Sequence, residues 1–139
     1  MGQAEDAPLG YLLYRAATAL RPEVSAALSP LGLTLPDFVC MRILAQSPGL
    51  SSAELSRHAG VTPQAMNSVL RKLEEIGVVA RPDSVSSGRA LPATLTGPGQ
   101  ELLKRAETVV RAADARLLAK LTADQQREFT RMLERLGSD

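Results

Sequence analysis

The chain has 139 residues, of which 45% are hydrophobic and 3% aromatic, and its 16 basic and 15 acidic residues give a formal net charge of +1. A chain of this length fits a single domain, or one domain with helical extensions, and can bury roughly 70% of its unfolded surface, so it needs no disulfide to fold. The near-neutral charge restricts any nucleic-acid-binding surface to a local patch. A single cysteine excludes an internal disulfide, and one cysteine with one histidine disfavours a zinc site.

The N-terminal segment, MGQAEDAPLG, has neither the basic start nor the apolar run of a signal peptide. No stretch of the sequence reaches the roughly 18 apolar residues that a membrane span requires. The sequence therefore predicts a soluble, cytoplasmic protein with no membrane partner, no metal and no cofactor.

The apolar residues are mostly Ala, Leu and Val, which favours a mainly helical fold because Ala and Leu are strong helix formers. A first helix is expected over residues 8–28, with Pro22 as a kink or the start of a new turn, and a loop is expected over 29–33. Thr34 and Ser51 each begin a further helix, because each is followed three residues later by an acidic residue that can complete a capping box.

The centre of the sequence has the spacing of a helix-turn-helix. The helix that starts at Ser51 is short because Gly60 ends it, and Thr62 and Pro63 begin the next helix, which Gly77 closes. The turn between these two helices, HAGVT, has the length and the glycine that are typical of this motif.

Two short strands are expected at 78–81 and 90–95, joined by the polar segment PDSVSSG as a hairpin with a long tip. A hairpin after a helix-turn-helix makes a winged helix. The predicted fold class is therefore mainly α with a small two-stranded β wing.

Two helices are expected after the hairpin. Thr96 caps a long helix over about 98–121, and Thr122 with Gln125 forms a third capping box that opens the last helix. The apolar residues of the long helix exceed what the central region can cover, which favours packing against a second chain; the alternative is that the terminal helices form only an intramolecular core.

The helix over 63–76 has two distinct faces. Its apolar face is predicted to lie in the core, as Met66, Val69, Leu70, Leu73 and Ile76. Its outward face carries Gln64, Asn67, Ser68, Arg71 and Glu75. Gln and Asn can pair bidentately with adenine in the major groove, and the N-terminal part of the second helix of a helix-turn-helix contacts base edges. The alternative interpretation is an ordinary solvated face.

The predicted DNA contacts extend beyond this helix. Arg71 and Lys72 lie further along it, where phosphates are the expected partners, and Arg89 on the hairpin suits a narrow minor groove. For Arg89 the alternative is a plain solvent-facing side chain. The full predicted set is Ser51, Ser52, Thr62, Pro63, Gln64, Asn67, Ser68, Arg71, Lys72, Ser86, Ser87 and Arg89.

Three blocks of the sequence resemble, in order and spacing, the core of the MarR family of bacterial transcription regulators: LTLPDFVCMRIL, LSSAELSRHAGVTPQAMNSVLRKLEEIGVVAR and GRALPATLTGPGQELL. Within the family, the sequence is similar to a mycobacterial member that responds to salicylate-type aromatic acids. The wing departs from the family pattern, since Ser87 stands where the family usually has an Asp that orients the Arg at position 89.

The resemblance implies one MarR-like domain over 1–139, with dimerisation helices at 8–28 and 98–136 around a winged helix-turn-helix at 34–95. It implies an obligate homodimer that binds a roughly palindromic site on double-stranded DNA, most simply as a repressor, and releases the DNA on binding a small aromatic acid such as salicylate.

Such a ligand needs an apolar slot and a cation for its carboxylate. The candidate cations are Arg15 and Arg21, followed by His58 and Arg42. For each of them the alternative is a surface or interhelix salt bridge.

The sequence offers three other functions. Some family members sense peroxide with a cysteine, but Cys40 lies among apolar residues like a small core side chain. An enzyme is disfavoured, because the single possible base, His58, sits in the helix-turn-helix turn. A winged helix that binds only proteins stays open, and the salt dependence of DNA binding would separate it from a regulator.

Overall fold

A computed structural model of the protein describes residues 6–82 and 92–137. The elements are α2 (Leu9–Leu28), a 3₁₀ turn η1 (Ser29–Leu31), α3 (Leu35–Gln46), α4 (Ser52–Ala59), α5 (Pro63–Glu75), β1 (Val79–Ala80), β2 (Thr94–Leu95), α6 (Gly97–Leu118) and α7 (Ala123–Gly137). The predicted fold class, mainly α with a small two-stranded sheet, is confirmed.

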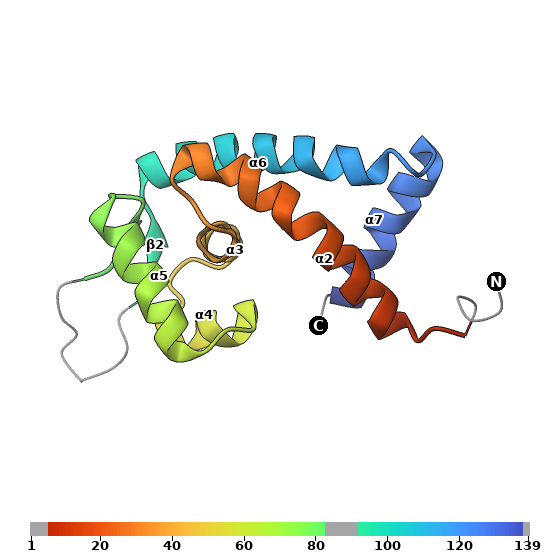
Figure 1. Ribbon diagram of the computed structural model, residues 1–139. Coiled ribbons are helices and arrows are strands. Elements are labelled where there is room, and N and C mark those ends of the chain that lie inside the picture. Colours follow the sequence, from red (N-terminus) through yellow and green to blue (C-terminus); the bar gives the residue numbers. More distant parts are fainter. Residues whose placement is uncertain (1–5, 83–91, 138–139) are drawn as a thin grey trace.

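The molecule is elongated, with α6 running along its length and α2 packed against it (Figure 1). At one end, α3, α4, α5 and the small sheet form a lobe beneath α2 and α6. At the other end, α7 folds back from α6 toward the N-terminal half of α2 (Figure 1). The helix-turn-helix therefore lies at the opposite end of the fold from α7 and the N-terminal half of α2, while the C-terminal half of α2 packs on the lobe (Figure 1).

The helix starts follow the predicted caps. Asp37 and Glu54 each accept a hydrogen bond from the N–H of their cap residue, at 2.8 Å from Thr34 and 3.0 Å from Ser51. Thr122 and Gln125 form the third capping box. Because a cap satisfies backbone donors within one turn, it can be read from sequence alone.

The predicted loop over 29–33 is in part helical, because Ser29–Leu31 forms a 3₁₀ turn that continues directly from α2. Gly32 ends this turn at φ +75°, a conformation that favours glycine. Pro22 lies inside α2, which continues through it as one helix.

The sheet is smaller than predicted and includes a pairing that the sequence did not indicate. β1 and β2 are antiparallel, with Val79 opposite Leu95 and Ala80 opposite Thr94. Leu50, between α3 and α4, forms an isolated bridge with Ala93. A single bridging residue has no alternation to detect, so local sequence patterns miss it. The predicted hairpin tip lies outside the described residues.

The hydrophobic core lies between α3, α4, α5 and the facing sides of α2 and α6. Its largest fully buried apolar side chains are Leu28, Met41, Leu44, Leu55, Met66, Leu70 and Leu73. Ile76 was predicted to belong to this core, and that prediction is wrong, since its side chain is 51% exposed. The reason is local: α5 ends at Glu75 and Gly77 turns the chain at φ +81°, so Ile76 leaves the helical face.

Within residues 6–82 and 92–137, no single helix is long and apolar enough to cross a membrane. Among the same residues, one bent pair of segments meets the test on length and composition when its two members are taken together. The pair is Leu9–Leu31 and Leu35–Gln46, bent by 80°.

Candidate nucleic-acid interface and ligand pocket

The exposed face of α5 is made of uncharged polar side chains at its N-terminal half. Gln64, Asn67 and Ser68 are exposed, while Met66 and Leu70 of the same helix are fully buried. Within the described part of the chain, no hydrogen bond engages the side chains of these three residues. Their donors and acceptors are therefore available to an external partner.

The turn between α4 and α5 fixes how this face is presented. Gly60 adopts φ +69° and ends α4, and the Thr62 hydroxyl accepts a 3.1 Å hydrogen bond from the N–H of Ala65 to begin α5. Thr62 and Pro63 are exposed, and Ser51 and Ser52 at the start of α4 are half-buried. The positive end of the α5 dipole therefore faces outward at its N-terminus, where anions bind favourably.

The basic residues near this surface differ in their pairing. Arg71 is exposed at the C-terminal half of α5. Arg81 donates two hydrogen bonds to Glu74, at 2.8 and 3.0 Å, and these hold the pKa of Glu74 below its usual value and raise that of Arg81. The ammonium of Lys72 lies 2.5 Å from Asp37, a contact that the sequence did not indicate. The predicted wing contacts Ser86, Ser87 and Arg89 lie outside the described residues.

A cavity of about 440 Å³, here called the interhelix cavity, lies between the long helix α2 and the helix-turn-helix lobe. Most of its wall is apolar, and the one charged side chain in the wall is Arg21. The lining residues are Arg21, Ser25, Thr34, Leu35, Pro36, Val39, Ala59, Val61 and Met66. An apolar slot with a cation at its edge matches the chemistry of an aromatic carboxylate.

The other three predicted ligand cations do not line this cavity. Arg15 lies on the exposed part of α2, with its guanidinium 6.0 Å from the centre of the Tyr11 ring. Arg42 forms an ion pair with Glu107 at 2.7 Å. His58 is exposed near the end of α4. The structure thus brings only Arg21 of the four to the cavity, and it adds Ser25 and Thr34, two polar wall residues that sequence patterns did not identify.

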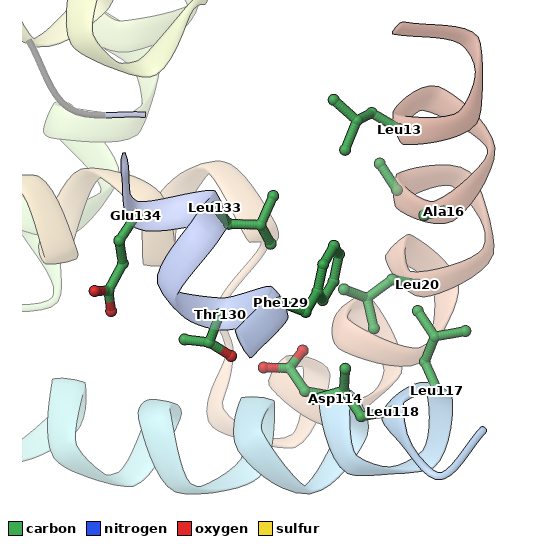
Figure 2. Close-up of a pocket in the computed structure, with 11 residues that line it drawn as sticks. Leu13, Ala16, Leu20, Asp114, Leu117, Leu118, Phe129, Thr130, Leu133 and Glu134 are labelled. Atoms are coloured by element: carbon green, nitrogen blue, oxygen red, sulfur yellow. The ribbon is translucent and has the colours of Figure 1, made fainter. Parts of the chain in front are cut away.

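A second cavity of about 660 Å³, here called the terminal cavity, opens between α2, α6 and α7. Figure 2 shows Leu13, Leu20, Phe129 and Leu133 directed into it from α2 and α7. Asp114 of α6 also lines it, and burial raises the pKa of that carboxyl. Large apolar side chains continue beyond the cavity on the exposed surface of the same helices: Leu9, Tyr11, Leu12, Tyr14, Met132 and Leu136. A surface of this kind marks an interaction site.

Cys40 is fully buried in α3. Burial, reinforced by the neighbouring Asp37 carboxylate, raises the pKa of its thiol to about 12. Because the thiolate is the reactive form, this environment favours a structural thiol over a peroxide sensor. Among residues 6–82 and 92–137, no three His, Cys, Asp or Glu side chains are grouped as metal ligands would be.

Comparison with known proteins connects this geometry to a family. The MarR family pattern matches residues 33–91. Over all 139 residues, the chain is 79% identical to the HTH-type transcriptional repressor Rv2887 of Mycobacterium tuberculosis strain H37Rv, and the alignment covers 100% of both chains.

Two crystal structures of that mycobacterial MarR family protein are similar to this fold. One contains salicylic acid; it is 79% identical, the match covers 96% of this chain and 98% of that one, and the TM-score is 0.81. The other contains DNA; it is 75% identical, the match covers 96% of this chain and 100% of that one, and the TM-score is 0.82.

Proposed function

The chain belongs to the MarR family of transcription regulators, and from that premise we propose that it is a sequence-specific DNA-binding repressor released by a small aromatic acid. The observation that carries the proposal is the polar face of α5, presented by a helix-turn-helix, whose Gln64, Asn67 and Ser68 side chains form no hydrogen bond with any described residue. The repressor that is 79% identical over its full length, and its structures with DNA and salicylic acid, support it.

We assign base reading to the N-terminal half of α5. Gln64 and Asn67 present amide groups that can pair bidentately with adenine, and Ser68 can contact either kind of base pair. Ser51, Ser52, Thr62 and Pro63 lie at the starts of α4 and α5, where backbone N–H groups and hydroxyls suit phosphates. Arg71, further along α5, would bind phosphate. Ser86, Ser87 and Arg89 would contact the DNA from the wing.

We propose that two copies associate through α2, α6 and α7, with 8–28 and 98–136 as the dimerisation segments and 34–95 as the DNA-binding region. The terminal cavity and the apolar side chains around it supply a surface that a second copy would cover. Two copies of α5 related by a two-fold axis would then read major grooves about 34–36 Å apart on a roughly palindromic operator.

The ligand would bind in the interhelix cavity, with its ring among Leu35, Val39 and Met66 and its carboxylate on Arg21. This cavity lies between a dimerisation helix, the start of α3 and the turn between α4 and α5, so its occupancy biases how the two α5 helices are spaced. The ligand would favour a dimer with the wrong spacing and shift the population away from the DNA-competent form. The function is binding in the cytoplasm, without a catalytic step.

Fluorescence anisotropy with the purified protein tests the proposal. A duplex from upstream of its own gene is compared with a scrambled duplex at two salt concentrations, with and without millimolar salicylate. Selective, salt-sensitive binding that salicylate weakens is expected. If DNA binding is selective but salicylate does not weaken it, the proposed ligand is wrong. If the protein selected neither that duplex nor any duplex from a random library, the proposed regulator function would be wrong. A winged helix that binds proteins would then be the remaining interpretation.

A further inference from the structure

The ammonium of Lys72 is paired inside the protein. It lies 2.5 Å from Oδ2 of Asp37, a carboxylate whose side chain is 2% exposed, while the Lys72 side chain is 39% exposed. Arg71, the preceding residue, is exposed. Adjacent helical positions differ by about 100°, so Arg71 points outward while Lys72 turns toward α3.

Asp37 connects the start of α3 to α5. The same Oδ2 atom that binds Lys72 also accepts a 2.8 Å hydrogen bond from the N–H of Thr34, which caps α3. Thr34 lines the interhelix cavity, and so does Met66, a buried residue of α5. A short chain of contacts therefore runs from the cavity wall through Asp37 to the C-terminal half of α5.

The burial of Asp37 decides which partner Lys72 keeps. A buried carboxylate that loses its cation is strongly unfavourable, because no water replaces the lost interaction. An exposed lysine that contacts a DNA phosphate gains a modest, screened interaction. Lys72 therefore keeps Asp37 as its partner when a phosphate is nearby.

We propose that Asp37 and Lys72 are a positioning pair that fixes α5 on the N-terminus of α3 and couples the interhelix cavity to DNA binding. This inference rests on the proposed function and replaces the phosphate contact that the sequence predicted for Lys72. A ligand that displaces the Thr34 segment changes how Asp37 orients α5, so the effect of the ligand on DNA affinity depends on the pair.

Four variants test the pair by anisotropy on a selectively bound duplex: Lys72→Met, Lys72→Arg, Asp37→Asn and the double variant Asp37→Asn/Lys72→Met. Asn at position 37 keeps an oxygen for the Thr34 cap and leaves no unpaired buried charge, so it remains informative if Lys72→Met fails to fold. Circular dichroism and thermal melting establish which variants fold.

Three quantities are measured for each folded variant: the dissociation constant, the slope of log affinity against log salt, and the salicylate factor, which is the ratio of dissociation constants with and without salicylate. Lys72→Met and Asp37→Asn should each weaken binding about three- to tenfold and lower the salicylate factor by a similar ratio, as expected for residues along a coupled path. Their salt slopes should match that of the wild type, and Lys72→Arg should behave as the wild type. In the double variant the losses should not add.

Two results would overturn the inference. If Lys72→Met flattened the salt slope by about 1.8, Lys72 would be a phosphate contact, since each lost contact changes the slope by about 0.9 and the dimer would lose two. If every variant kept the wild-type affinity and salicylate factor, the pair would not position α5. Failure of the wild-type protein to select any duplex would instead reject the proposed function, so the two failures are distinguishable.

Discussion

The guanidinium of Arg42 lies 2.7 Å from the carboxylate of Glu107, so an ion pair joins α3 to α6. Arg21 has no ion-pair partner within the described part of the chain, and it lines the interhelix cavity. Both arginines are candidate cations for the ligand that the family resemblance implies, and the structure separates them by their partners. A carboxylate ligand would find an available cation at Arg21, whereas at Arg42 it would have to displace Glu107.

Arg21→Gln should weaken salicylate binding about tenfold or more, because it removes a charge-assisted hydrogen bond to the carboxylate. Isothermal titration calorimetry measures this directly. Arg42→Gln is the matched control and should bind salicylate as the wild type does. If Arg21→Gln bound salicylate no more weakly than Arg42→Gln does, the carboxylate of the ligand would not lie on Arg21.

Asp114→Asn should stabilise the protein at neutral pH. Burial raises the pKa of Asp114 in the fold, so the folded state holds this proton more tightly than the unfolded chain does. The ionised carboxylate therefore destabilises the fold above the raised pKa, and this destabilisation is relieved as the pH falls through it.

The expected gain in melting temperature is about 1–3 °C at pH 7, shrinking toward acid pH. Scanning calorimetry at several pH values and a fixed protein concentration checks it, since dimer stability depends on concentration. A constant gain at every pH would show that packing, and not the charge, is responsible.

Leu133→Glu should dissociate the dimer. Leu133 lines the terminal cavity, and a carboxylate there would meet apolar side chains such as Leu13 and Phe129 (Figure 2). Analytical ultracentrifugation should show a monomer at concentrations where the wild type is a dimer. Ala53→Glu, an equally charged change on the exposed side of α4, is the control and should leave the dimer intact. A dimeric Leu133→Glu protein would move the interface away from α7.

Cys40 should be unreactive in the folded protein. Its thiol is fully buried and its pKa is about 12, so almost no thiolate exists at neutral pH. A thiol reagent such as iodoacetamide should modify Cys40 only when denaturant unfolds the chain, as mass spectrometry would show. Rapid modification of the native protein would favour the redox alternative.

The sequence predicted the local features of the fold well. Helix starts at Thr34, Ser51, Thr62 and Thr96 follow from contacts within one turn, and the structure contains all of them. The two faces of α5 follow from its period, with the exception of Ile76, where the helix had already ended.

What the sequence could not reveal are contacts between distant residues. Lys72 meets Asp37 across 35 positions, and Arg42 meets Glu107 across 65. Arg71 and Lys72 are neighbours on α5, yet only Lys72 turns toward α3. No local pattern distinguishes a lysine that faces DNA from one that pairs with a buried carboxylate. The interhelix cavity could not be predicted for the same reason, because its wall is formed by four segments that are separate in the chain.

The central claim is that the exposed N-terminal face of α5 reads DNA sequence. The most direct test is the ratio of dissociation constants for a selected and a scrambled duplex, measured by anisotropy for the wild type, Gln64→Ala, Asn67→Ala and Gln100→Ala, an exposed position on α6. Each α5 variant should lose about 1–3 kcal/mol of discrimination, while Gln100→Ala keeps the wild-type ratio. Wild-type ratios in both α5 variants would contradict the claim and place sequence reading on another surface.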